Sequence, residues 1–301
     1  MFKTIGAYVG NYKKQAILSP VAIVGEVAME VLIPYIMSLI IDNGIKEGRV
    51  GYVAGMGGLM VLMSVCSLFF GALAARMSAV AAMGFAKNLR SALFRKVQDF
   101  SFANVDKFST ASLTTRLTTD VTNIQNAFMM LIRGAVRSPI MLISASIAAV
   151  KINPRLSTVF LFAVPILGFT VFFIISKAHP RFESMLRKYD DMNAKVQENL
   201  IGIRVVKAFA REDYEKKKFS ENTQSVKLAQ FLAEKLIIMN MPIMQLVMYG
   251  SITAILWFGG NMAFNGTLET GQLSSFISYV AQILSSLMML SMLFILFVIS
   301  R

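Results

Sequence analysis

Six long apolar stretches constrain the fold of this 301-residue chain more than any other feature. Each is long enough to cross the hydrocarbon core of a bilayer, which takes about 20 residues of α-helix. A spanning segment of this length must satisfy its backbone hydrogen bonds internally, so the stretches are predicted to be helices of an all-α membrane protein. The predicted spans are about residues 16–41, 51–81, 127–150, 156–176, 236–260 and 272–300.

Basic residues gather on one predicted side of the membrane. An even number of spans puts both termini on the same side, and that side carries 26 of the 30 lysines and arginines. The opposite side has only Lys46, Arg49, Lys151 and Arg155. This positive-inside bias predicts a multi-pass protein of the cell membrane with both termini in the cytoplasm. The net charge of +13 then requires no nucleic-acid partner.

Two hydrophilic excursions, between spans two and three and between spans four and five, are predicted to be helical hairpins. In the second, apolar residues recur in steps of three and four from Phe182 to Val206, which is one stripe of a helix. In the first, Leu89, Leu93 and Val97 follow the same spacing. We therefore expect the spanning helices to continue far into the cytoplasm, turn and return.

Two acidic residues, Glu26 and Glu30, lie near the middle of the first span. A charge at that depth costs roughly 2.5–3.5 kcal/mol on insertion scales, so such residues usually face a protein interior or a water-filled cavity. Their spacing of four residues places both on one helix face. The pair suggests a pathway for a cationic compound. The alternative is that they pair with a neighbouring helix, or stay protonated, for packing alone.

Further polar and flexible side chains mark a candidate substrate cavity. A helical stripe of polar residues in span six should face a helix interface or a cavity rather than lipid. Methionines on one face of span five suit a surface that accepts many shapes, although facing lipid or packing is the simpler explanation. The candidate lining residues are Met244, Met248, Ser275, Ser278, Gln282 and Ser285, together with Glu26 and Glu30.

Other isolated residues receive structural assignments. Arg133 and Arg137 of span three are assigned to the inner interface, where long basic side chains can snorkel. Cys66 is the only cysteine, so no internal disulfide can form, and His179 is the only histidine. No metal site and no catalytic constellation is predicted.

The hairpin tips carry the most specific sequence. The first reads FANVDKF at 102–108 and TASLTTRLTTDV at 110–121, and the second reads ENLIGIRVVKAFAREDYE at 198–215. The short opposite-side loops carry IDNGI at 41–45 and GTLETGQL at 266–273. Together these runs resemble the transmembrane domain of ABC exporters of the type IV fold, which has six long helices per half. The resemblance covers the whole chain.

This resemblance implies that the hairpin tips form short coupling helices that dock on nucleotide-binding domains, at about Ala103–Ser109 and Phe209–Glu215. The second hairpin would reach the nucleotide-binding domain of the partner subunit. Aromatic anchors with flanking charges suit such docking. The implied coupling residues are Phe102, Asn104, Asp106, Lys107, Phe108, Phe209, Arg211, Glu212 and Tyr214.

One departure from the family pattern concerns Ala111, which stands where Gly is commonest. The surrounding run is more similar to heterodimeric bacterial multidrug exporters, which favours a heterodimer over a homodimer. The chain has no G-x-x-x-x-G-K-[ST] run, so it carries no phosphate-binding loop of an ATPase. ATP and Mg²⁺ are therefore expected at nucleotide-binding domains outside this chain, which is expected to be a fragment of a longer polypeptide.

The predicted function is ATP-driven export of amphipathic compounds, cationic ones among them, or of lipids, by alternating access. One alternative is a proton-coupled secondary transporter that uses Glu26 and Glu30, but such proteins usually have broken helices and lack long hairpins. The other is a non-transporting membrane scaffold whose hairpins dock partners. That alternative leaves the polar stripe of span six without a role.

Overall fold

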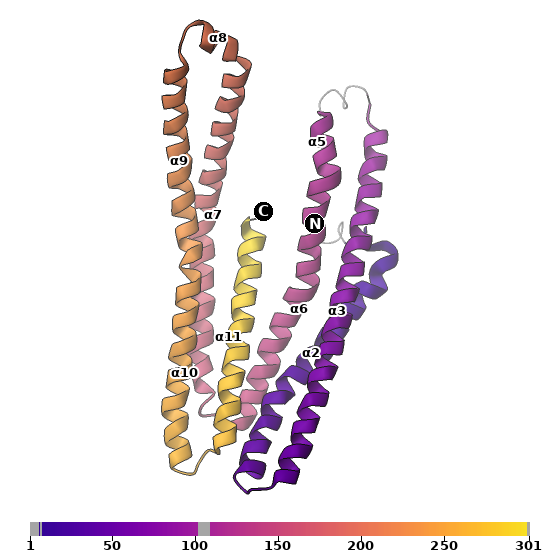
Figure 1. Cartoon of the computed structure of the whole chain (residues 1–301), viewed down its shortest axis with the longest axis vertical. Helices are drawn as coiled ribbons and strands as arrows, with labels where there is room; N and C mark the ends of the chain where they lie inside the picture. Colours follow the sequence, from indigo (N-terminus) through magenta and orange to yellow (C-terminus); the bar gives the residue numbers. More distant parts are fainter. Residues whose placement is uncertain (1–5, 7, 102–108, 300–301) are drawn as a thin grey trace. The chain divides into compact units, whose positions relative to one another are not determined.

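The computed structural model describes residues 6, 8–101 and 109–299, and these residues contain helices and no strand (Figure 1). The chain divides into two compact units. The first comprises Met1–Thr158 with Ile252–Leu293, and the second comprises Val159–Ser251 with Phe294–Arg301. Among the described residues, six helical segments are long and apolar enough to span a membrane, which confirms the predicted all-α membrane fold.

Each predicted span overlaps one of these six segments. The first unit contains η1 (Gly10–Tyr12), α2 (Lys13–Leu39), η2 (Ile40–Ile45), α3 (Val50–Gln98), α5 (Thr110–Thr115), η3 (Arg116–Asp120) and α6 (Val121–Ile152), with most of α11 (Thr270–Ile299). The second contains nearly all of α7 (Thr158–Ile201), α8 (Ile203–Ala208), α9 (Glu212–Ile238) and the first half of α10 (Asn240–Phe264).

The helices that enter the two hairpins are much longer than a membrane is thick. At 1.5 Å per residue, the 49 residues of α3 extend about 74 Å and the 44 residues of α7 about 66 Å. The hydrocarbon core is about 30 Å thick, so more than half of each helix lies beyond it. Figure 1 shows α7 and α9 running beside each other to a tip that carries α8.

Polar bonds hold the second hairpin together, as expected for a helix pair outside the apolar core. They join α7 to α9 at successive levels. The partners are Arg181 with the Leu232 carbonyl (2.9 Å), Tyr189 with Gln230 (3.0 Å), Lys195 with Asn222 (2.6 Å) and Asn199 with Glu215 (3.0 Å). These bonds recur along the hairpin and hold α7 and α9 together as a helix pair.

The short helix at this tip lies six residues earlier than predicted. It spans Ile203–Ala208, whereas the expected coupling helix was Phe209–Glu215. Gly202 ends α7, and Ala210, with a φ of 49°, turns the chain back. Glu212 then begins α9, whose acidic first turn is stabilised by the helix dipole. The first predicted coupling helix lies almost wholly outside the described residues, which resume at Ser109.

The start of α11 is docked on the end of the first spanning helix. The backbone N–H of Gly271 donates to Asp42 Oδ1 (2.7 Å), so a carboxylate from η2 satisfies one of the free donors at the N-terminus of α11. A Cβ at position 271 would lie 2.5 Å from the Ser38 carbonyl oxygen and 2.7 Å from Asp42 Oδ2. Only glycine permits this close approach.

We predict that Gly271→Ala lowers thermal stability, because the added methyl group must push α11 away from Ser38 and Asp42. Overpacking of this kind costs about 1–3 kcal/mol. The measurement is the melting temperature of the purified protein in detergent. Gly260→Ala is the matched control, since a Cβ there meets nothing within 4 Å. A Gly271→Ala variant as stable as the Gly260→Ala variant would contradict the docking described here.

Candidate functional site

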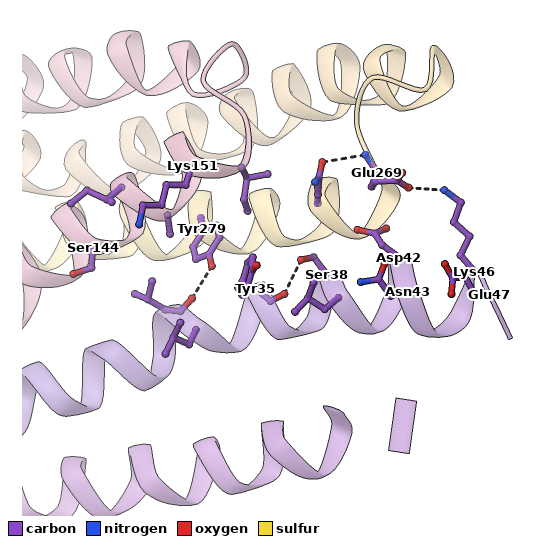
Figure 2. Close-up of a pocket in the computed structure, with 17 residues that line it drawn as sticks. Tyr35, Ser38, Asp42, Asn43, Lys46, Glu47, Ser144, Lys151, Glu269 and Tyr279 are labelled. Atoms are coloured by element: carbon purple, nitrogen blue, oxygen red, sulfur yellow. Dashed lines mark hydrogen bonds and ion pairs between the residues drawn. The ribbon is translucent and has the colours of Figure 1, made fainter. Parts of the chain in front are cut away.

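Two cavities follow one another along the same three helices of the first unit, α2, α6 and α11. The mid-helix cavity has a volume of about 590 Å³ and is lined by residues that include Glu30, Arg137 and Gln282. The loop-end cavity has a volume of about 1090 Å³ and is lined by residues that include Tyr35, Lys151 and Glu269 (Figure 2). On α2 and α6 the second set of residues continues towards the loops where the first set ends.

A partly buried charge cluster lies at the mid-helix cavity, with Glu26 buried and Glu30 and Arg137 half-buried. Arg137 Nη2 of α6 donates to both carboxylate oxygens of Glu30 of α2, each at 2.8 Å. Arg137 Nε lies 3.5 Å from Glu26 Oε1, one turn along α2. The side chain of Glu26 is only 9% exposed and packs against Gly71 of α3, where a Cβ would come within 3.3 Å of the carboxylate. One arginine therefore faces two acids.

This cluster has one acidic group in excess. Glu30 accepts the short bonds, whereas Glu26 Oε2 is buried with no hydrogen-bond partner among the described residues. Arg137 Nε makes no hydrogen bond there either, although it approaches Glu26. In a low-dielectric interior each of these charges depends on the others, because an isolated ion is costly to bury.

The role of Arg137 was missed in the sequence. The snorkelling assignment is wrong for this residue, whose guanidinium turns to α2 instead of the membrane surface. The available signal was a basic residue within the third predicted span, at a depth similar to that of the two acids in the first span. Of the two explanations offered for the acids, their contact with a neighbouring helix is what the geometry supports directly. Arg133, one turn earlier, is exposed.

Three side chains of α11 bind backbone carbonyls of α2. Ser275 donates to the carbonyl of Pro34, Tyr279 donates to that of Val31 (2.7 Å), and Gln282 donates to that of Glu30 (3.3 Å). Pro34 has no N–H, so the Glu30 carbonyl four residues earlier loses its helical partner. Gln282 supplies a replacement donor, and the proline in α2 is thereby tolerated within the membrane.

The polar stripe predicted in span six divides between two environments. Ser278, Gln282 and Ser285 line the mid-helix cavity, and Ser138 and Ser286 join them there. Ser275 is buried against α2 instead and lines neither cavity.

The two methionines predicted to line the substrate cavity lie on α10. Met244 is buried and Met248 is partly exposed, and both belong to α10 within the second unit. Neither is among the residues that line the two cavities.

The lining of the loop-end cavity changes from apolar to charged along its length. Apolar side chains such as Leu32 and Ile147 line one part, and charged side chains line the part near the loops. Lys46 pairs with Glu269 (2.6 Å), while Glu47 pairs with Arg49 (2.9 Å). The hydrogen bond from Lys46 to Glu269, and the negative charge of that carboxylate, raise the pKa of the lysine above its ordinary value.

The second hairpin tip exposes aromatic and aliphatic side chains. Phe209 is 75% exposed and Tyr214 is 58% exposed, with the Arg211 guanidinium 5.5 Å from the Tyr214 ring centre. Glu212 begins α9 beside them, and Leu200 and Val205 add exposed apolar surface. The predicted residues of the first tip, Phe102, Asn104, Asp106, Lys107 and Phe108, lie outside the described residues.

Six membrane-length helices with long hairpins and paired cavities define a transporter-like membrane domain, and sequence comparison identifies its family. The model of the ABC transporter transmembrane region matches residues 16–298. The chain therefore belongs to the ABC transporter transmembrane region family.

Among its relatives, the uncharacterised ABC transporter ATP-binding protein YfiB of Bacillus subtilis is 30% identical over 91% of this chain and 48% of its own length. The uncharacterised ABC transporter ATP-binding protein Rv1273c of Mycobacterium tuberculosis is 33% identical over 82% of this chain and 42% of its own length. The ATP-dependent lipid A-core flippase of Albidiferax ferrireducens is 24% identical over 76% of this chain and 40% of its own length. The chain thus spans about half the length of the curated relatives it matches.

We predict that Arg137→Met destabilises the protein by about 1–3 kcal/mol, because it leaves the buried acid Glu26 and the half-buried acid Glu30 without their cation. Adding Glu26→Gln and Glu30→Gln to this variant should restore most of the stability, since the excess charge is then gone. Arg133→Met is the control and should change little. The measurement is thermal unfolding in detergent. Failure of the two glutamine substitutions to restore stability would argue against charge as the cause.

Proposed function

We propose that this chain is the membrane half of an ATP-driven exporter that moves amphipathic compounds, cationic ones among them, or lipids, by alternating access. The observation that carries the proposal is the succession of two cavities along α2, α6 and α11. The first offers hydroxyls, an amide and an ion pair at mid-helix, and the second continues to the loop end. Such a series provides polar contacts across a depth where lipid offers none.

The energy source in this proposal lies outside the chain. ATP and Mg²⁺ would bind nucleotide-binding domains, and the hairpin tips would receive their motion. The exposed Phe209 and Tyr214 support a docking role for the second tip. Ala111, in α5 just after its N-cap Ser109, stands where Gly is commonest in the family. This departure resembles heterodimeric exporters and supports pairing with a different second half. The basic hairpins support an orientation with both termini in the cytoplasm, so that the loop-end cavity opens outward.

The charge cluster of Arg137, Glu30 and Glu26 bears on the charge of the proposed substrate. Arg137 compensates Glu30 directly, so the acids do not form a bare anionic face. Two acids still face one arginine there, which supports a preference for cationic amphiphiles over anionic ones at the mid-helix cavity. A flippase among the relatives, named for lipid A-core, supports lipids as the alternative substrate class. Family membership favours ATP over a proton gradient as the driving force.

One prediction concerns coupling. In the transporter assembled with its nucleotide-binding domains, Phe209→Ala should lower substrate transport roughly thirtyfold while ATP hydrolysis continues, because a central interface anchor contributes about 2 kcal/mol. Transport into proteoliposomes and phosphate release are measured together. Phe172→Ala removes an equally exposed phenylalanine of α7 away from the tip and is the control. Normal transport by the Phe209 variant would remove this tip from the coupling role.

A second prediction concerns water access along α11. In a Cys66→Ala background, cysteines introduced by Ser278→Cys and Ser285→Cys should react with a water-soluble thiol reagent. Ile283→Cys is the control, because Ile283 is fully buried. Reaction at the two serine positions should change when nucleotide is trapped, since alternating access alters the route of water. Labelling that differs between the two faces of α11 but does not change with nucleotide would support the cavity. It would contradict alternating access driven by ATP.

A further inference from the structure

Glu26 is the more deeply buried of the two acids in the charge cluster. Its side chain is 9% exposed, against 27% for Glu30, and it lines neither cavity. Glu26 Oε2 has no hydrogen-bond partner among the described residues, whereas Glu30 accepts both short bonds from Arg137. A buried carboxylate that lacks a donor on one oxygen is costly unless its charge is neutralised.

The groups that face Glu26 supply one positive charge. In the described part of the chain, its ionic contact comes from Arg137 of α6. The helix α3 presents Gly71 to the carboxylate, which adds no titratable group. The helix α11 presents the neutral groups of Gln282 and Tyr279, which donate to carbonyls of α2. A guanidinium does not lose its proton in proteins, so Arg137 is shared by two acids, and charge balance requires a proton or a second cation.

The mid-helix cavity reaches this cluster at Glu30 and Arg137, which both line it. Two further lining residues carry buried polar atoms without a hydrogen-bond partner among the described residues, namely Ser138 Oγ and Gln282 Oε1. Ser138 is only 2% exposed. Buried polar atoms of this kind commonly bind water, so the cavity offers a polar route for a proton between the cluster and solvent.

Arg137 can change partners with a small movement. Its Nη2 lies 2.8 Å from both oxygens of Glu30, and its Nε lies 3.5 Å from Glu26 Oε1 without forming a hydrogen bond. The two acids are one turn apart on α2, about 6 Å along the helix axis. A guanidinium has five N–H donors, so a rotation of this side chain is enough to bring its donors to Glu26.

We propose that a cation that binds at Glu30 displaces a proton from Glu26. Before the cation enters, Arg137 holds Glu30 and the proton neutralises Glu26. The cation then pairs with Glu30, the guanidinium moves to Glu26, and the O–H bond of Glu26 breaks, with its proton passing to water in the mid-helix cavity. Two acids then face two cations, and the net charge of the cluster is unchanged. This exchange rests on the proposed function only for the arrival of cationic substrates in the cavity.

The test is binding of tetraphenylphosphonium to the assembled transporter in phosphatidylcholine nanodiscs without nucleotide. It is measured by titration calorimetry in two buffers of different ionisation enthalpy, which gives the number of protons released. This cation has no proton to lose, so the protons come from the protein. The wild type should release protons, and its affinity should rise with pH by up to about tenfold per pH unit, because proton and cation compete. Neutral triphenylphosphine oxide should release none.

Three variants separate the two acids. Glu26→Gln resembles the protonated acid, so it should bind the cation more weakly than the wild type, with no proton release and no change of affinity with pH. Glu30→Gln should weaken cation binding because it removes the acid that lines the cavity. Glu183→Gln is the matched control, since it removes an exposed acid of the second unit and should behave as the wild type.

Cation binding without proton release in the wild type would overturn the exchange, as would absence of cation binding or proton release that persists in Glu26→Gln. ATP-driven transport of tetraphenylphosphonium into proteoliposomes is measured with the same preparations. Proton-linked binding without transport would reject the proposed function and leave the exchange standing. Transport with binding that does not depend on protons would reject the exchange and leave the proposed function standing.

Discussion

The charge cluster of Arg137, Glu30 and Glu26 constrains the rest of the first unit. A guanidinium at membrane depth must be compensated, and the acids that compensate it belong to α2. This requirement fixes which face of α6 meets α2. Gln282 of α11 then binds the Glu30 carbonyl beside the same cluster. The three helices that line both cavities are thus oriented by polar contacts.

The same orientation links the cavity to the first hairpin. α5, η3 and α6 form one uninterrupted helical segment from Thr110 to Ile152. Thr110 lies next to the hairpin tip, and Arg137 follows 27 residues later, which is about 40 Å along the axis. A single helical segment, with the π-helical turn of η3 inside it, thus connects the described residues nearest the tip to the residue that holds the charge cluster. Long-range coupling needs such a continuous and rigid element.

Much of the fold was predictable because hydrophobic length and helical spacing are local properties. The spans and the regular stripe from Phe182 to Val206 required no knowledge of the partner helices. The pairing of Arg137 with Glu30 was not predictable in this way, since it depends on which of six helices become neighbours. The division of the span-six stripe failed for the same reason. Ser275 and Ser278 look alike in sequence, but Ser275 is buried against α2 and donates to the Pro34 carbonyl, whereas Ser278 lines the mid-helix cavity. At the second tip the predicted stripe continued to Val206, whereas Gly202 separates α7, which ends at Ile201, from α8.

The bonds from Ser275, Tyr279 and Gln282 to α2 all end on main-chain oxygens. A carbonyl is present whatever side chain the residue carries. The bonds from these three donors to α2 therefore do not depend on most of the side chains of α2. Residues such as Leu32 and Tyr35 can be substituted while the hydrogen bonds from α11 to α2 are kept. Under the proposed function, the helix wall that would meet a transported molecule could therefore vary in sequence, and related chains could take new cargo without a change in how the wall is held.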